Sequence, residues 1–233
     1  MYIAGSLLPF GMAYQQHLSC MHCASTCMRK GTSRGIQLLR CKGCRKYQRS
    51  AYRHRARVPG TSAHITVLVR EGCGIRGIGR VLAISPTTVI ARIKRIAAGL
   101  GPGFIPKGRD YEVDELVTCI GHKQNRVWVA YAWERKERRV VAMRIGRRSK
   151  RHLRPLIDTL LLADARRIRT DGLDIYRSLI PHRIHRALRF GTNGIERMTL
   201  TMRTRLKRLA RCTICYSKSA AMLHACVAIA CWG

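Results

Sequence analysis

Two pairs of cysteines near the amino terminus constrain the fold of this chain more than any other feature. Cys20 and Cys23 form one CxxC motif, Cys41 and Cys44 form a second, and 17 residues separate the two motifs. Each motif places two thiolates on one tight turn, and two such turns complete a tetrahedron around Zn²⁺. The spacing therefore predicts a structural zinc ribbon over residues 1–60, with all four positions around the metal filled by protein.

The alternative for these cysteines is a set of ordinary buried thiols. A module this polar has little core without a metal, so the zinc site is favoured. Cys27 is a spare candidate ligand. A later group of cysteines is different, because its later pair lies in an apolar run where Cys usually behaves as a small buried hydrophobe. For that group, packing is favoured over metal binding; its members are Cys212, Cys215, Cys226 and Cys231.

The charge of the chain indicates a polyanionic partner. Its 45 Lys and Arg oppose 12 Asp and Glu, which gives a formal net charge of +33. Such proteins bind nucleic acid or anionic membranes, because neutralising phosphates releases counterions. The apolar residues 219–231 are too few to span a bilayer, which needs about 20 residues. The opening apolar run has no Lys or Arg before it, which argues against a secretory signal. We therefore expect double-stranded DNA as the partner, no membrane, and a cytoplasmic, nucleoid-associated location.

The distribution of acidic residues and of glycine and proline divides the chain into modules. Residues 1–70 contain 12 Lys and Arg and no Asp or Glu. Four Gly and two Pro within residues 99–108 forbid regular structure and mark a linker. All but one of the acids lie beyond it. The predicted modules are the zinc ribbon at 1–60, a helical domain at 61–98, the linker at 99–108 and a third domain at 109–233.

The sequence pattern of residues 61–98 predicts three short helices arranged as in a helix-turn-helix. Apolar residues suit a first helix at 63–71, and helical spacing continues from Ile75 to Leu82. Ser85 followed by Pro86 predicts the start of a third helix, with Ser as the N-cap. That helix would bury Val89, Ile93 and Ile96, and would direct side chains suited to bases and phosphates outward: Thr87, Thr88, Arg92 and Arg95. The alternative is a plain three-helix packing unit.

The region after the linker predicts an α/β domain with carboxylates at the ends of its strands. The expected order is strands at 110–120, 126–133 and 139–145, a helix at 150–164, a strand from 167 that ends at Asp171, and a further helix. Asp114 lies within the first strand, where an acid is disfavoured unless something binds it. Carboxylates on neighbouring strands, joined by one from a helix, can hold two Mg²⁺ ions. The rivals of Asp114 are Glu112, on the same strand face, and the adjacent Glu115, while Asp174 suits a helix N-cap.

Glu196 is the candidate for the helical carboxylate, because no other acid occurs from residue 175 onward. The helix that carries it has a predicted buried stripe of Ile195, Met198, Met202, Leu206 and Leu209. Arg203 and Lys207 fall near the face of Glu196 and predict phosphate contacts. The alternative is that Glu196 is a surface acid paired with arginines.

These segments resemble the insertion-sequence-1 (IS1) family of transposases. The resemblance is carried by VDEL around Asp114, by TDGLDIY around Asp171 and by IERMTLTMRTRLKRL around Glu196, and it extends to both CxxC motifs and to residues 75–98. It implies a ribonuclease-H-like catalytic domain preceded by a small zinc ribbon and an all-α helix-turn-helix domain. It also implies a DDE active site, with Asp114, Asp171 and Glu196 binding catalytic Mg²⁺ (or Mn²⁺).

The function implied by this resemblance is transposition of an insertion sequence. The chain would bind the terminal inverted repeats as a homo-oligomer on paired ends, and would then cut DNA and join it to a target. The alternatives are a non-enzymatic zinc-containing DNA-binding regulator, a nuclease of similar fold without transfer activity, and an inactive transposase copy.

Overall fold

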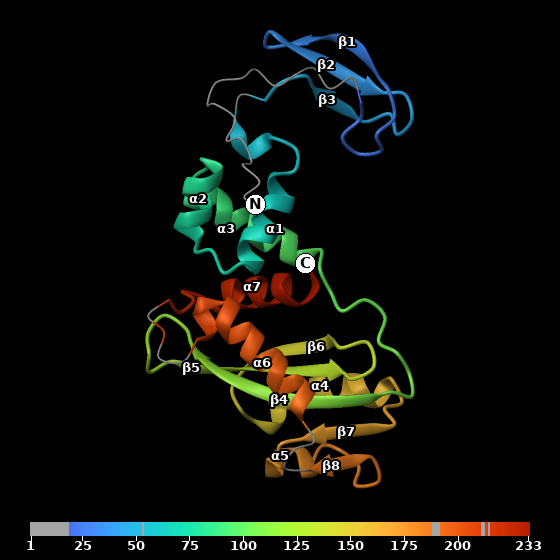
Figure 1. The fold of residues 1–233 in the computed structure, drawn as a ribbon, viewed down its shortest axis with the longest axis vertical. Coiled ribbons are helices and arrows are strands. Elements are labelled where there is room, and N and C mark those ends of the chain that lie inside the picture. The colour runs from blue at the N-terminus through green and yellow to red at the C-terminus, as the bar shows by residue number, and fades with distance from the viewer. Residues whose placement is uncertain (1–18, 53, 188–191, 211–212, 214) are drawn as a thin grey trace, which may run out of the picture. The chain divides into compact units, whose positions relative to one another are not determined.

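The computed structural model describes residues 19–52, 54–187, 192–210, 213 and 215–233. The chain divides into two compact units, of which the first ends at Thr61 and the second runs from Ser62 to Gly233. Figure 1 shows a small sheet in the first unit, and helices with a larger sheet in the second. The predicted mixed α/β class is confirmed.

The first unit contains a three-stranded antiparallel sheet. Its strands are β1 (Cys27–Ser33), β2 (Ile36–Cys41) and β3 (Tyr47–Arg49), in the order β1-β2-β3, and the short helix η1 (Arg55–Arg57) follows. The turn between β1 and β2 consists of Arg34 and Gly35, which both have positive φ. Two such residues match the twist of a tight hairpin. The buried core of this unit is small and consists mostly of cysteine side chains: Cys20, Cys27, Leu39 and Cys41.

The second unit begins with three helices, α1 (Thr61–Arg70), α2 (Ile75–Leu82) and α3 (Pro86–Ala98). The predicted start of α3 is confirmed, because the Ser85 hydroxyl accepts the backbone N–H of Thr88 and Pro86 is the first helical residue. The buried residues of α3 are Val89, Ile93 and Ala97. Ile96, which was predicted to be buried, is only half-buried. No helix or strand lies between Ala98 and Asp110, a stretch that is described throughout.

A five-stranded mixed sheet forms the centre of the second unit. Its strands are β4 (Asp110–Cys119), β5 (Arg126–Glu134), β6 (Arg139–Gly146), β7 (Arg167–Thr170) and β8 (His185–Ala187), in the order β6-β5-β4-β7-β8. Strands β4, β5 and β6 are antiparallel neighbours, whereas β7 lies parallel to β4 and β8 parallel to β7. The central strand β4 therefore has a parallel neighbour on one side only.

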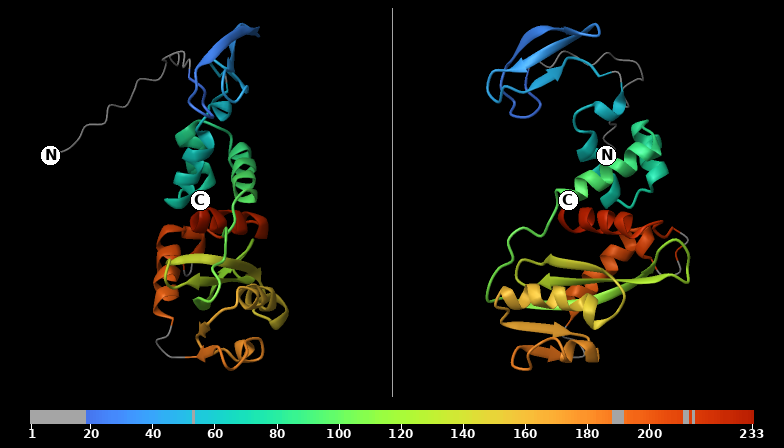
Figure 2. Two further views of the ribbon diagram at one scale, coloured as in Figure 1. Left: turned by 90° about the vertical axis from the view of Figure 1, so that its right-hand side faces the viewer. Right: turned by 180° about the vertical axis from the view of Figure 1, so that it is seen from behind.

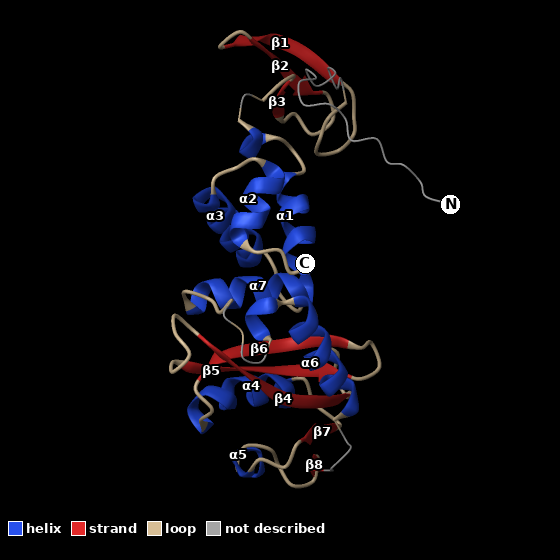
Figure 3. Ribbon diagram, turned by 60° about the vertical axis from the view of Figure 1, so that its left-hand side comes forward, coloured by secondary structure: helices blue, strands red, loops and turns tan. Residues whose placement is uncertain are grey.

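Helices cover both faces of this sheet (Figures 2 and 3). They are α4 (Lys150–Leu162), α5 (Asp174–Arg177), α6 (Asn193–Arg205), η2 (Lys207–Leu209) and α7 (Ala220–Trp232). Strand β5 shows why two layers form, because its buried side chains alternate between faces. Val129 and Tyr131 pack in the core with α6 and α7, while Ala130 and Ala132 pack in the core with α4 and α5.

The carboxy-terminal helix α7 is apolar around most of its circumference because more than one of its faces packs against other elements. It packs against α3 and also against β6, where the indole N–H of Trp232 donates to the carbonyl of Val140 at 2.8 Å. Residues 62–98 and the five-stranded sheet therefore share one continuous hydrophobic core. Among the described residues, no helix has the length and apolar character needed to cross a bilayer.

Two sequence-based expectations for helices were wrong in detail. The helix that carries Glu196 ends at Arg205, and Lys207 belongs to the separate turn η2. Glu196 and Lys207 therefore do not lie on one face of the same helix. Asp174 is the first residue of α5 and is not its N-cap, because Leu173 takes that place. The Asp171 carboxylate instead accepts the backbone N–H of Leu173 at 3.1 Å.

Candidate functional site

The parallel pairing of β4 with β7 brings two of the predicted carboxylates side by side. Glu112 of β4 lies opposite Arg169 of β7. Two positions further along the two chains come Asp114 and Asp171. Because parallel strands advance by nearly the same rise per residue, the two aspartates reach the same level of the sheet. The local sequence identifies each aspartate as a candidate, and the pairing of the two strands makes them neighbours.

A third carboxylate, Glu115, joins them. One carboxylate oxygen from each of Asp114, Glu115 and Asp171 lies within 4.8 Å of the other two. Carboxylate oxygens are the ligands that Mg²⁺ and Mn²⁺ prefer, and such sites commonly use few protein ligands. The donor set therefore fits a divalent cation of this kind.

The electrostatics of this group favour the binding of a cation. Burial, together with the charges of Glu115, Asp171 and Glu196, raises the pKa of Asp114 to about 6. Burial also raises the pKa of Glu115, while hydrogen bonding to Tyr176 and the charge of Arg148 oppose the rise. Three acids in one half-buried place repel one another unless a positive charge lies between them.

Arg148, in the loop between β6 and α4, provides such a positive charge. Its Nη2 lies 3.3 Å from Oε2 of Glu115 and 3.5 Å from Oδ2 of Asp171. The other oxygen of Glu115 accepts the hydroxyl of Tyr176 on α5 at 2.7 Å. Glu115 is thus held by two side chains, whereas the Asp114 carboxylate accepts the backbone N–H of Glu115 at 2.7 Å.

Glu196 lies in the first turn of α6 but does not belong to the three-oxygen group. It is exposed, and its Oε1 accepts the hydroxyl of Thr192 at 2.8 Å. Its charge nevertheless raises the pKa of both Asp114 and Glu112, so it lies near these two residues of β4. The structure thus gathers Asp114 and Asp171 as the sequence predicted, and it places Glu115 in closer contact with them than Glu196.

Glu112, the other rival of Asp114, has a different environment. It is 1% exposed, accepts the backbone N–H of Ile195 at 2.8 Å, and lies 2.9 Å from Nε of Arg135. A carboxylate at the first turn of a helix also interacts favourably with the helix dipole. Glu112 therefore fastens the start of α6 to β4, and it keeps Glu196, the next residue after Ile195, on the side of Asp114.

The two predicted phosphate-binding cations of this region lie apart. Arg203 is half-buried on α6. Burial raises the pKa of Tyr131, the residue opposite Asp114 in the sheet, and the charge of Arg203 opposes this rise. Lys207 is exposed in η2.

The four predicted zinc ligands lie together in the first unit. One sulfur from each of Cys20, Cys23, Cys41 and Cys44 lies within 4.8 Å of the others. The Sγ–Sγ distance is 3.5 Å for Cys20 and Cys44, and 3.4 Å for Cys23 and Cys41. Ligands at about 2.3 Å around a tetrahedral Zn²⁺ would lie about 3.8 Å apart, so the cluster has nearly the right size.

The remaining cysteines lie outside this cluster. Cys27 is buried opposite Cys41 in the sheet, and burial raises the pKa of its thiol. Burial likewise raises the pKa of Cys226, and that of Cys231 to about 12. Cys215 is exposed, and Cys212 lies outside the described residues. Cys215, Cys226 and Cys231 belong to none of the metal-ligating groups found among the described residues.

The four predicted DNA-contacting residues of α3 differ in their surroundings. Thr87 and Arg95 are exposed, whereas Thr88 and Arg92 are half-buried. The Thr88 hydroxyl is hydrogen-bonded to Ser85 at 2.8 Å, and Nη1 of Arg92 donates to the hydroxyl of Ser62 on α1 at 2.9 Å. Arg92 thus helps to hold α1 and α3 together.

Sequence reasoning missed Arg148 and Tyr176 and gave no structural role to Glu112. No local pattern identifies Arg148, because its partners lie 33 and 23 residues away. The sequence could have indicated a role for Glu112, because an acid at an even-numbered position of this strand faces the same side as Asp114.

Comparisons with known proteins find relatives of this chain. A family model described as IS1 transposase matches residues 110–230, more than half of the chain. The protein InsB of insertion element iso-IS1n from Shigella dysenteriae is 36% identical over 108 residues, which are 46% of this chain and 82% of that protein. InsB of insertion element IS1 from Shigella flexneri is 34% identical over the same shares. InsB of insertion element IS1 4 from Escherichia coli K12 is also 34% identical, with 65% of that protein covered.

Proposed function

Because the chain belongs to the family of IS1 transposases, we propose that it binds the terminal inverted repeats of an insertion sequence and catalyses strand cleavage and strand transfer. Asp114, Asp171 and Glu196 form its DDE site in this proposal. The juxtaposition of Asp114 with Asp171 on the paired strands β4 and β7 carries the proposal. The sheet order β6-β5-β4-β7-β8, with three antiparallel strands followed by two parallel ones, supports a ribonuclease-H-like catalytic domain.

Each residue of the site has a separate role in this proposal. Mg²⁺ or Mn²⁺ bound to the carboxylates would stabilise the charge on the attacking and leaving oxygens of the phosphodiester. Asp114 and Asp171 hold their positions through the sheet. Glu112 keeps α6 against β4, so that Glu196 stays near Asp114. Arg148 neutralises Glu115 and Asp171, and it provides a guanidinium at the site that suits a phosphate oxygen.

The parts outside the sheet supply the binding of DNA in this proposal. The cysteine cluster holds a structural Zn²⁺, and α1, α2 and α3 form a helix-turn-helix in which α3 is the reading helix. Thr87, Thr88, Arg92, Arg95, Arg203 and Lys207 are the proposed DNA contacts. Double-stranded DNA, as element ends and as target, is the partner, so the protein acts on nucleoid DNA in the cytoplasm. Two paired ends call for a homo-oligomer.

One reaction separates this function from its rivals. The purified chain is incubated with Mg²⁺, labelled element ends and an unlabelled target duplex, and the products are separated by size. We expect shortened ends together with longer, joined products. Cutting without joining would identify a nuclease, while binding without cutting would identify a DNA-binding regulator or an inactive copy.

The third carboxylate can be identified by exchanging each candidate for its amide. We expect Glu196→Gln to lower strand transfer by about 10²-fold or more, because this exposed side chain is the more able to turn toward a cation. We expect Glu115→Gln to lower strand transfer less and also to lower the melting temperature by a few degrees, because it weakens the contacts with Tyr176 and Arg148. Transfer rates and melting curves of both variants are compared. The reverse order of transfer rates would assign the third ligand to Glu115.

The reading helix can be tested with two arginines that have different partners. We expect Arg95→Ala to weaken the binding of element ends by about tenfold without changing the melting temperature, because Arg95 is exposed. Arg92→Ala should also destabilise the fold by about 1 kcal/mol, because it removes the hydrogen bond to Ser62. The matched control is Lys94→Ala, which removes the same charge about 100° away around the helix. Equal effects of Lys94→Ala and Arg95→Ala on binding would contradict a reading face.

A further inference from the structure

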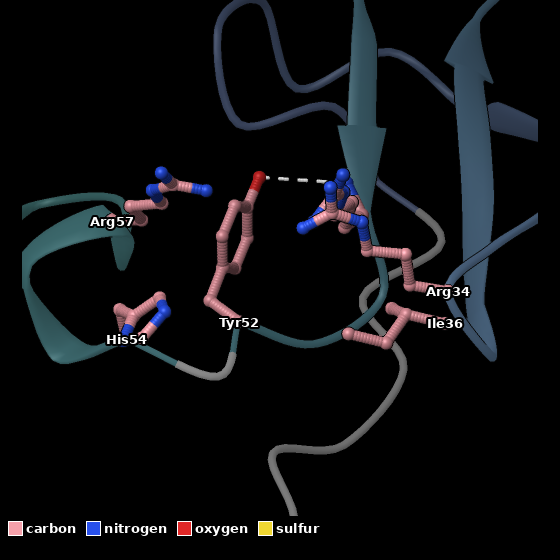
Figure 4. A pocket seen from close by; sticks show the side chains of 6 residues that line it. Arg34, Ile36, Tyr52, His54 and Arg57 are labelled. Atoms are coloured by element: carbon pink, nitrogen blue, oxygen red, sulfur yellow. Dashed lines mark hydrogen bonds between the residues drawn. The ribbon is translucent and has the colours of Figure 1, made fainter.

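A cationic pocket in the first unit lies outside the predicted zinc site. It has a volume of about 100 Å³ and is lined by Arg34, Ile36, Arg49, Tyr52, His54 and Arg57. Figure 4 shows the Tyr52 ring in its centre, with His54 and Arg57 on one side and Arg34 and Ile36 on the other. The lining residues come from three places: the β1–β2 turn and start of β2, the end of β3 with the segment after it, and η1. Three guanidinium groups therefore meet where separate segments of the chain converge.

Nothing within this unit can neutralise the pocket with a carboxylate. The first acidic residue of the chain is Glu71, ten positions beyond the end of the unit at Thr61. Like charges held together in one hollow are destabilising, and the destabilisation is relieved when an anion enters. Guanidinium groups match the oxygens of a phosphate through paired hydrogen bonds, which favours a phosphate over a simple halide.

The polar groups of the pocket are also arranged to donate. The backbone N–H of Arg49 donates to the Tyr52 hydroxyl oxygen at 3.4 Å, which leaves the phenolic proton available for an acceptor. Nη2 of Arg49 donates to the Ser33 hydroxyl at 3.4 Å, and this contact helps to orient the guanidinium. Arg34 is held on the tight turn between β1 and β2, with φ at 54°. The donors are thus set by the fold of the unit and surround one small volume.

We propose that this pocket binds a single backbone phosphate of the DNA, with Arg34, Arg49 and Arg57 contacting the same phosphodiester and the Tyr52 hydroxyl donating to it. This inference rests on the proposed function, because it takes DNA as the partner. It adds that the first unit has a defined phosphate site, so its contact with DNA is not only a diffuse attraction between opposite charges. Such a site would fix the position of the unit on the duplex without reading its sequence.

The salt dependence of binding tests whether the arginines share one phosphate. Each phosphate neutralised on B-DNA contributes about 0.9 to the slope of log affinity against log salt. The full chain is titrated with a labelled random-sequence duplex at several salt concentrations and without Mg²⁺. We expect Arg34→Gln, Arg57→Gln and the double variant all to reduce the slope by no more than about 0.9, because they lose the same contact. A loss of about 1.8 in the double variant, or no loss in any variant, would overturn the pocket.

The controls match charge, exposure and backbone conformation. Arg45 and Lys46 are exposed in the same unit, and Arg45 has φ at 59°, close to that of Arg34. We expect Arg45→Gln and Lys46→Gln either to leave the slope unchanged or to reduce it independently of each other, so that the reductions of the two single variants add up in the double variant. Tyr52→Phe keeps the ring and should lower affinity by a few-fold with the slope unchanged, because no charge is lost; unchanged affinity would remove Tyr52 from the proposed contact. Bound zinc and melting temperature are measured for every variant, so that loss of folding is distinguished from loss of contact.

Two further outcomes identify the source of the phosphate and separate this inference from the proposed function. Inorganic phosphate, added at constant ionic strength, should not displace DNA at concentrations well below those of the added salt. Strong displacement that disappears in Arg57→Gln would assign the pocket to free phosphate and overturn the DNA assignment. A wild-type chain that binds no DNA would contradict the proposed function itself. A wild-type chain that binds DNA, with pocket variants that bind equally well, would remove only the pocket.

Discussion

Asp114→Asn is expected to lower strand transfer by about 10³-fold or more, because it removes a charged ligand at the point where the phosphodiester charge must be stabilised. Asn has nearly the size of Asp, so the surrounding packing should be preserved. Binding of element ends should stay unchanged, since Asp114 is not one of the proposed DNA contacts. Strand transfer with Mg²⁺ and affinity for the ends, measured on the same preparation, check both statements.

The same substitution should leave the protein as stable as before or make it more stable. Burial and the charges of Glu115, Asp171 and Glu196 raise the pKa of Asp114 to about 6, so ionised Asp114 is unfavourable in the folded state without a cation. A neutral side chain removes this cost. We expect a melting temperature that is unchanged or higher by about 2–4 °C for each kcal/mol gained, measured without divalent metal.

The matched control is Asp174→Asn, three residues beyond Asp171. Asp174 has 91% of its side chain exposed and contacts Arg177 on the same short helix. An amide there removes the same charge outside the acidic group, so transfer should stay close to wild type. Undiminished transfer in Asp114→Asn would remove this residue from the active site. A large loss in Asp174→Asn would show that net charge governs the rate.

Removal of zinc is expected to unfold the first unit. Metal binding to four thiolates contributes about 10–16 kcal/mol in small zinc domains, and here it adds to a core of only a few residues. Purified chain should contain one zinc per chain. A strong chelator should remove this zinc and abolish the strand signal in circular dichroism that arises from β1, β2 and β3. Readdition of zinc under reducing conditions should restore the signal.

Substitution of single cysteines localises this effect. Cys23→Ser should abolish stoichiometric zinc, because it removes one of the four clustered sulfurs. Cys27→Ala changes a buried thiol in the same sheet that lies outside the cluster, so it should lose some stability by packing and retain zinc. Zinc is measured by atomic absorption in both variants. Full zinc in Cys23→Ser, or its loss in Cys27→Ala, contradicts the proposed ligand set.

The features that the sequence predicted correctly depend on short stretches of chain. The CxxC spacing places two sulfurs on each turn, and Ser85 with Pro86 caps α3 through a bond to a residue three positions away. Alternation of side chains identified β4, β5 and β6 within one or two residues. The helix of Glu196 was predicted too long, because Leu206, whose backbone is extended, and Leu209 in η2 are both buried, as they would also be along one helix.

The amino-acid sequence by itself determined the two CxxC motifs, the places of β4, β5, β6 and α3, and Asp114 and Asp171 as candidate ligands, because these follow from local spacing and from short segments of chain. Only the tertiary structure decided that Glu115 joins Asp171, that Arg148 pairs with both of them, that Glu112 anchors α6, and that Arg92 bonds to Ser62. Each of these contacts joins residues more than 20 positions apart in the chain. No local pattern encodes such pairs, since they form only when the packing of helices on the sheet brings the side chains together.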